Sequence, residues 1–369
     1  MDAARGLLMI LMALDHAISF ICRIHYSEFW AFPMPDYGGS LLAFFTRFVS
    51  HLCAPGFAFF MGAGMVLFAE SRGRRGWGTS SLVRHFWLRA FVLVGVSLTL
   101  ENFFWHAGEL STRPDAQWGV FFSILCTLAG SMAAGSFLLR LPALLLMSLS
   151  AGFILLAPMA LPIGQPVEGL SQALSLPRIV LFVPWGHQTF LGRSYFIYPL
   201  VPWLGITLAG MVLGKALAAR GEPVLKGLHR VGFVLLLAFL VARFAGIPGN
   251  INTIPPSGLI GFLSITKYPP SPAFVFFTLG MNCLLLWFLD RIAPFLGEAN
   301  ALLVFGRVPF FFYILHIGLF CALGWVIRPA GYAVGYGTWL AGLALLYLPC
   351  RCFAVFKKGA SPDSLWRLF

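Results

Sequence analysis

An arginine and a histidine in the first hydrophobic segment have a spacing that suggests catalysis. Arg5 begins the stretch RGLLMILMALDHA, and His16 follows it by eleven residues. In a helix, eleven residues turn about 20° past three full turns and rise roughly 16 Å, so both side chains fall on one face. The pair predicts a cation at a membrane surface and an imidazole near mid-bilayer, and ionisable groups at such depths are functional candidates.

Further titratable residues accompany this pair. Asp15 lies about 100° round the helix from His16, so it could pair with a cation or polarise a different histidine. His316 follows Pro309, a residue suited to a first helical turn, and Arg307 just before it would mark an anion site at a helix N-terminus. His51 lies in HLCAPGFAFFMGAG, inside the membrane or at its rim. For each histidine, ordinary core packing is the alternative to catalysis.

Arginines close to helix ends could bind phosphate groups. Arg84 and Arg89 flank the start of the third hydrophobic segment, and with Arg5 they would form a basic surface suited to phosphates. Arg307 could assist them. A general excess of cations on the cytoplasmic side explains most of the other basic residues.

The composition indicates a polytopic membrane protein. The 369 residues are 59% hydrophobic and only 10% charged, with a mean hydropathy of +0.86, which excludes an ordinary soluble domain. The net charge of +12 resides largely in short linkers, so we interpret it as a topology signal and predict no nucleic-acid partner. The seven cysteines have no Cys-x-x-Cys spacing, so we predict neither a zinc site nor a disulfide framework.

About ten transmembrane helices in one bundle are expected, forming an all-α integral membrane protein with a single domain over residues 1–369. The predicted spans are 5–22, 46–69, 86–105, 118–139, 143–162, 195–216, 231–248, 272–290, 308–327 and 335–353. The distribution of lysine and arginine places both termini in the cytoplasm, and the plasma (inner) membrane is the expected location. The long segments 23–45, 163–194 and 249–271 would face the outside, and their length favours a role in substrate contact.

Several stretches resemble known membrane acyltransferases. The Arg-x10-His spacing resembles a motif of enzymes that acylate cell-surface polysaccharides, and the chain as a whole resembles the heparan-α-glucosaminide N-acetyltransferase family. The resembling stretches are RGLLMILMALDHA (5–17), HLCAPGFAFFMGAG (51–64), YPLVPWLGITLAGMVLG (198–214), KYPPSPAFVFFTLG (267–280) and FGRVPFFFYILHIGLF (305–320). Lysosomal members of the family have asparagine where this chain has His16, and their active histidine lies in the following loop, where the nearest residue here is His25.

This resemblance implies an acyltransferase that passes an acetyl group from acetyl-CoA across a membrane to an extracytoplasmic carbohydrate. We expect Arg5, Arg84 and Arg89, helped by Arg307, to bind the phosphates of coenzyme A. His16 would act as base or acyl carrier, with assistance from Asp15, His51 or His316. No metal is expected, and a homodimer is compatible with this reading. A proton-coupled transporter is the alternative function, and a non-catalytic membrane scaffold is a third reading.

Overall fold

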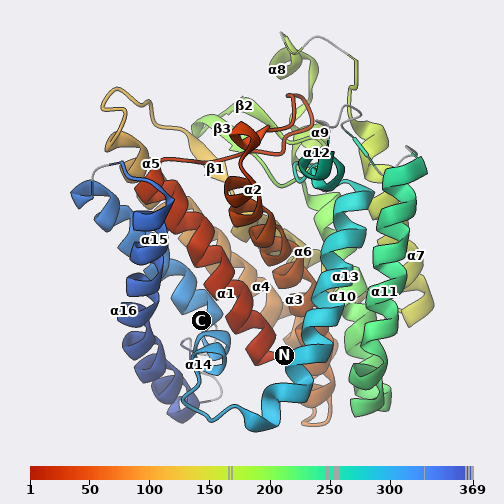
Figure 1. Cartoon of the computed structure of the whole chain (residues 1–369). Coiled ribbons are helices and arrows are strands. Elements are labelled where there is room, and N and C mark those ends of the chain that lie inside the picture. Colours follow the sequence, from red (N-terminus) through yellow and green to blue (C-terminus); the bar gives the residue numbers. More distant parts are fainter. Residues whose placement is uncertain are drawn as a thin grey trace.

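The computed structural model describes residues 1–164, 167, 169–245, 250–251, 258–327, 329–361, 364 and 366. Parts of two loops expected to contact substrate, at 165, 166, 168, 249 and 252–257, lie outside the described residues. Long helices run side by side, and most loops, the short strands and several short helices gather at one end (Figure 1). We call this the loop end, and we call the opposite end, where the first helix begins, the N-terminal end.

Within the described residues, nine helical stretches are long and apolar enough to cross a membrane. They are Asp2–Cys22, Leu41–Gly73, Thr79–Leu110, Ala143–Ala160, Leu200–Arg220, Glu222–Ala245, Pro272–Phe295, Pro309–Val326 and Tyr332–Gly359. The last of them returns to the N-terminal end (Figure 1). The predicted all-α multi-pass membrane fold is therefore confirmed.

Several of these stretches combine more than one element. The α-helices within them are α1 (Asp2–Ala17), α2 (Leu41–Phe48), α3 (Cys53–Gly73), α4 (Thr79–Val96), α5 (Asn102–Leu110), α7 (Ala143–Leu156), α10 (Leu200–Arg220), α11 (Glu222–Ala245), α13 (Pro272–Ile292), α15 (Pro309–Val326) and α16 (Tyr332–Gly359). π-Helical turns at Ile18–Cys22 and Ser97–Glu101 extend α1 and join α4 to α5. Such turns are rare and are frequent at functional sites.

The fourth predicted span, 118–139, is only partly correct. Its helix, α6 (Ile124–Leu138), has 15 residues, slightly fewer than the roughly 17 or more of a typical membrane-spanning helix. Residues Val120–Phe122 before it form strand β1 instead. The predicted span 195–216 likewise begins too early, because Tyr195 and Phe196 belong to strand β3 and the helix starts at Leu200.

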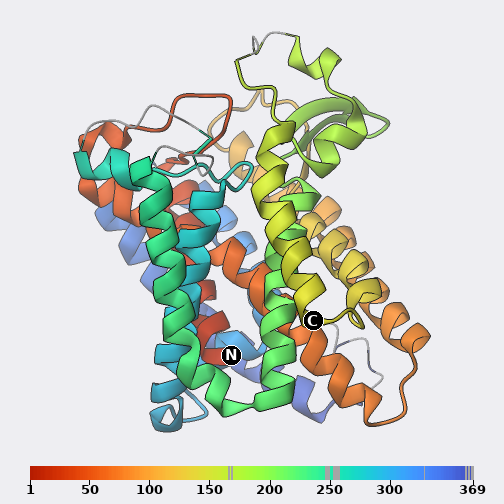
Figure 2. The ribbon, with the colours of Figure 1, turned by 90° about the vertical axis from the view of Figure 1, so that its right-hand side faces the viewer.

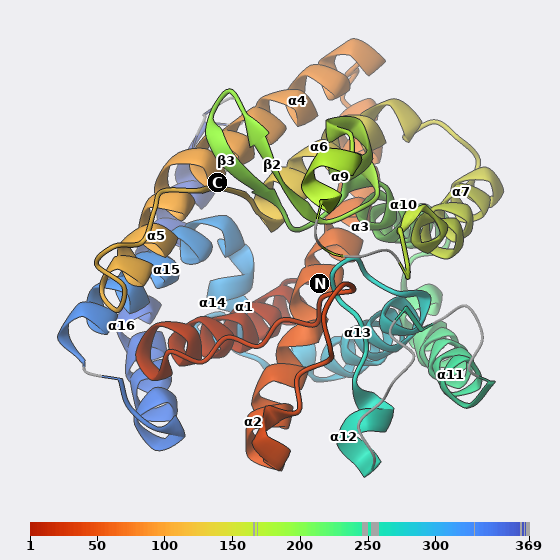
Figure 3. The same ribbon diagram turned by 90° about the horizontal axis from the view of Figure 1, so that it is seen from above.

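A small sheet covers part of the loop end. Strand β3 (Gly192–Phe196) lies between β1, which is parallel to it, and β2 (Trp185–Thr189), which is antiparallel. The short helices α8 (Leu170–Ala173), α9 (Leu176–Leu181) and α12 (Gly258–Leu263) gather at the same end (Figures 1 and 2). Seen from above, the segment after α1 crosses the bundle toward α2 (Figure 3), and its Trp30 N–H donates to the Tyr268 carbonyl at 3.0 Å.

Glycines allow two helix pairs to approach closely. α1 packs against α14 (Ala301–Arg307), and a Cβ placed on Gly306 would lie 1.8 Å from the Asp2 carbonyl oxygen. A Cβ on Gly210 of α10 would lie 1.9 Å from the Phe59 carbonyl oxygen of α3. Only a residue without a side chain fits such contacts, as at many membrane-helix interfaces. The α1–α14 contact brings Arg5 and Arg307 to the same region of the N-terminal end.

Candidate active site

A cavity of about 850 Å³ extends through the bundle beside α1. Its wall carries Arg5, Arg89 and Arg307 from the N-terminal half of the bundle and Asp15 and His16 from the last turn of α1. Farther on, it is lined by His25, Arg113 and Lys267 from the loop end. Residues from both ends of the membrane-spanning helices therefore share one cavity, and His16 lies between them.

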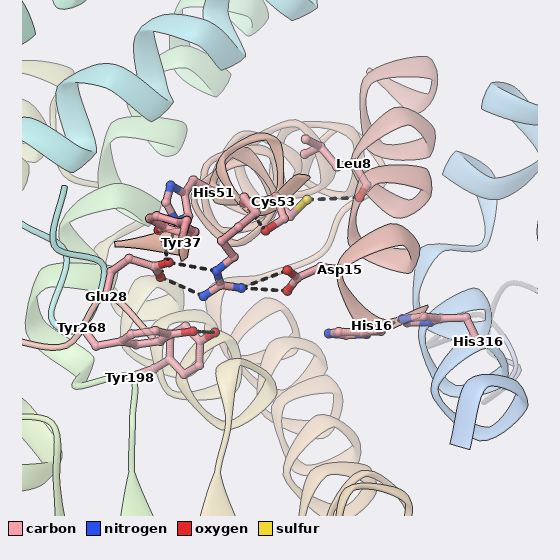
Figure 4. Close-up of polar contacts among 12 residues, drawn as sticks. Leu8, Asp15, His16, Glu28, Tyr37, His51, Cys53, Tyr198, Tyr268 and His316 are labelled. Atoms are coloured by element: carbon pink, nitrogen blue, oxygen red, sulfur yellow. Dashed lines mark hydrogen bonds and ion pairs between the residues drawn. The ribbon is translucent and has the colours of Figure 1, made fainter. Parts of the chain in front are cut away.

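His16 and His316 form a direct pair, which the sequence did not predict. The Nδ1 atom of His16 lies 2.7 Å from Nε2 of His316, and the two ring planes lie within 5° of parallel (Figure 4). His316 Nδ1 lies 3.0 Å from the Phe312 carbonyl oxygen. His316 is fully buried, whereas His16 opens onto the cavity.

These contacts assign the protons of two neutral rings. A carbonyl oxygen can only accept, so His316 carries its proton on Nδ1 and its Nε2 accepts from His16 Nδ1. His16 Nε2 then bears the free lone pair, and it forms no hydrogen bond to any residue within the described ranges. His316 thereby fixes the tautomer of His16 in the form that a general base requires.

Asp15 is held by an ion network rather than by either histidine. Arg47 of α2 donates from Nη1 to both carboxylate oxygens of Asp15, at 3.0 and 2.8 Å, and from Nε and Nη2 to Glu28, at 3.0 and 2.8 Å (Figure 4). The Tyr37 hydroxyl donates to Glu28 at 3.0 Å. Burial opposes ionisation of Glu28, but Arg47 and His51 hold the pKa of its carboxyl well below its usual value.

His51 belongs to this network and not to the cavity wall. Its Nε2 lies 3.4 Å from Glu28 Oε2, and its side chain is 1% exposed. The residues lining the cavity include its neighbours Ser50 and Cys53 but not His51 itself. The geometry thus favours a role for His51 in core packing over direct contact with a substrate.

Arginines at the N-terminal end differ in their exposure to the cavity. Arg5 donates a hydrogen bond from Nη1 to Asp2 Oδ1 at 3.1 Å. Arg307 lies two residues before α15 begins, as predicted, but it is also the last residue of α14, and it donates to the Glu298 carbonyl at 3.2 Å. Arg84 is exposed and lies off the cavity wall, unlike Arg89 one turn later.

A hydrogen-bonded carboxylate, Glu101, and an aromatic ring, Trp105, complete the surroundings of His16. Glu101, in the π-helical turn after α4, accepts hydrogen bonds from Tyr313 and from Ser97 and Ser123. Trp105 lies edge-on to His16, with ring centroids 5.2 Å apart, and the His25 ring lies 6.3 Å from the same indole. Protein around the imidazole, together with Arg47, lowers the pKa of His25 to about 4, so His25 is neutral near pH 7.

Comparison with known proteins assigns the chain to a family. The sequence model for heparan-alpha-glucosaminide N-acetyltransferase, catalytic, matches residues 1–243. The chain belongs to this family. It is accordingly a membrane protein of the acetyltransferase class, and the matched range contains Arg5, His16 and Arg89, whereas His316 and Lys267 lie beyond it. A search of curated proteins found no match.

Sequence reasoning missed Arg47, Glu28 and Lys267 as members of the site. Nothing in the local sequence of these residues signals that they lie beside the end of α1. The described residues contain no group of three His, Cys, Asp or Glu side chains arranged to hold a metal ion.

Proposed function

We propose that this protein transfers an acetyl group from acetyl-CoA, bound from the N-terminal end, to a hydroxyl or amine that enters from the loop end. The N-terminal end would face the cytoplasm, and the acceptor would be an extracytoplasmic carbohydrate. The observation that carries the proposal is the single cavity on which Arg5, His16 and His25 all lie. Family membership supports an acetyl group as the group that is transferred.

The cavity suits the layout of an acyl-CoA. Coenzyme A carries its phosphates at one end and its thioester at the other, separated by an uncharged arm. Arg5, Arg89 and Arg307 would bind the phosphates, because guanidinium groups form strong charge-assisted bonds to phosphate oxygens. The rise of roughly 16 Å from Arg5 to His16 would be spanned by the arm, beside apolar wall residues such as Met12 and Phe57.

His16 would act as the general base. Its Nε2 takes a proton from the acceptor while the acceptor oxygen or nitrogen attacks the thioester carbonyl carbon. The carbonyl π electrons move to oxygen and return when the C–S bond breaks, and that bond pair leaves on sulfur. Protonated His16 then gives the proton to the thiolate, so the products are CoA thiol and the acetylated acceptor. His316 positions His16 through its Nδ1 atom.

Asp15 is assigned an indirect role. Because Arg47 binds both of its carboxylate oxygens, Asp15 is unavailable as a freely titrating proton carrier. Its salt bridge instead ties the last turn of α1 to α2 and to Glu28 on the loop above. A carboxylate held in this way is better suited to keeping a catalytic site rigid than to the proton relay that a transporter would use.

The first test is loss of the base. Purified protein in detergent would be given acetyl-CoA with D-glucosamine as a probe acceptor, and release of CoA thiol and acetylated product would be measured. His16→Ala is expected to lower kcat by about 100-fold or more, the usual contribution of a general base. His229→Ala, on the surface where His229 bonds the Lys226 carbonyl, is the matched control and should retain the wild-type rate.

Full activity of His16→Ala would eliminate this assignment. If His25→Ala abolished turnover while His16→Ala did not, the base would be the loop histidine on the far side of Trp105. Proton-coupled uptake by liposomes, with no binding of acetyl-CoA, would favour a transporter instead.

A further inference from the structure

Lys267 is a buried cation on the cavity wall, and none of the acetyl-transfer steps proposed above uses it. Its side chain is 5% exposed and lines the same cavity as His16. Its backbone N–H donates to the Glu28 carbonyl at 3.0 Å, which fixes the segment before α13 against the ion network. Its charge lies within electrostatic reach of Asp15, His16 and His25.

The ammonium group of Lys267 has hydrogen-bond donors that the described residues around it leave unused. Its Nζ lies 5.2 Å from the centre of the Tyr268 ring, a cation–π contact, and it forms no hydrogen bond or ion pair with the residues that the structure describes. An ammonium group has three N–H donors, and burying it without acceptors is costly. The donors of Lys267 are therefore available to a group inside the cavity.

Other cations near His16 are already engaged. Arg47 donates its hydrogen bonds to the carboxylates of Asp15 and Glu28. Arg23 donates to the carbonyls of Gly108 and Gly324 at 3.2 and 2.6 Å. The hydroxyls of Tyr198 and Tyr268 lie 3.3 Å apart and share one hydrogen bond, which leaves a neutral donor. A charged donor forms a stronger bond to an anion than a neutral one.

We infer that Lys267 stabilises the oxyanion that forms when the acceptor attacks the acetyl carbonyl beside His16. The inference rests on the acetyl transfer proposed above. As the new C–O or C–N bond forms, the carbonyl π pair becomes a lone pair on oxygen, and Lys267 donates a hydrogen bond to that oxygen without losing its proton. When the C–S bond breaks, the carbonyl re-forms and the hydrogen bond weakens. Donors placed where charge develops lower the barrier because they require no reorganisation.

Lys267→Met tests this role in the full chain, because methionine has similar length but no charge or donor. With acetyl-CoA and D-glucosamine, kcat is expected to fall about 100-fold, the usual effect of removing an oxyanion donor. KM for acetyl-CoA and the affinity for CoA, measured by calorimetry, should change less than threefold, because the phosphates bind at the other end of the cavity. Lys226→Met, which removes an exposed cation, is the matched control and should leave both constants unchanged.

Two conservative variants test the oxyanion role of Lys267 if Lys267→Met does not fold. Lys267→Arg keeps charge and donors, and Lys267→Gln keeps donors alone, so kcat should decrease from wild type through Arg to Gln. Equal rates for these two variants, or a Lys267→Met enzyme with wild-type kcat, would overturn the inference. The second result would point to a carboxylate on the natural acceptor as the partner of Lys267, since glucosamine carries none. Absence of thiol release by the wild type would instead refute the proposed function itself.

Discussion

At the scale of single residues, the role proposed for His16 as a general base depends on its contact with His316, a histidine 300 positions away. The spacing of Arg5 and His16 predicted that both would lie on one helix face, and both line the cavity. His316 was also predicted as a candidate, but its contact with His16 was not. A pairing between α1 and α15 depends on how two helices distant in sequence pack, and one sequence carries no local signal for it.

The ion network makes a prediction about acid stability. The folded pKa of Glu28 is depressed, so its ionised form contributes stability above the unfolded pKa near 4.5, and this stability is lost as the pH falls through the folded pKa. Glu28→Gln should lower the free energy of unfolding near pH 7 by about 3 kcal/mol, since a buried pair loses a partner.

Thermal unfolding in detergent over a pH series measures this effect. The difference in unfolding midpoint between wild type and Glu28→Gln should be constant above about pH 5 and shrink on further acidification. Glu222→Gln, which alters an exposed carboxylate, should follow the wild-type curve throughout. A difference that grew as the pH fell would contradict the network described for Glu28.

At the scale of elements, hydropathy predicted most of the helices because each crossing must be a long apolar segment. Pro309 was correctly predicted at the start of its helix. Strands β1 and β3 and the short helix α14 were not predicted, because strands of three to five residues and a helix of seven carry little periodic signal. Glu28 and Lys267 lie in connections outside the long helices, so their place in the site could not be predicted from helix patterns.

The close contact of α1 with α14 predicts an effect on the proposed phosphate site at Arg5 and Arg307. Gly306→Ala would place a methyl group 1.8 Å from the Asp2 carbonyl oxygen, which must push the two helices apart. Overpacking of this kind costs about 1–3 kcal/mol, and it would move Arg5 and Arg307 relative to each other. CoA affinity should fall about tenfold, equivalent to one charge-assisted hydrogen bond.

Calorimetric titration of CoA into the purified variant measures this change. Gly227→Ala is the control, because a Cβ there meets no atom within 4 Å, and CoA affinity should stay at the wild-type value. Unaltered CoA affinity in Gly306→Ala would show that the α1–α14 contact does not set the phosphate site.

At the scale of the whole molecule, the cavity connects residues from the two ends of the bundle. Its N-terminal part is bordered by arginines, its middle by His16 and aromatic rings, and its loop end by Lys267 and the segments that fold over α1. Under the proposed function, such a cavity would allow a donor and an acceptor to meet at His16 from opposite sides while neither crosses the membrane. This geometry would explain why a membrane-spanning fold serves an acetyltransferase.

The measurement that tests this claim most directly is the sidedness of transfer in proteoliposomes. Labelled acetyl-CoA would be added outside, and D-glucosamine would be either trapped in the lumen or supplied outside with the donor. Acetylated glucosamine is predicted to accumulate in the lumen when the acceptor is trapped there, and not to form when both substrates are outside. Product formation only with both substrates on the same side would contradict transfer through the cavity.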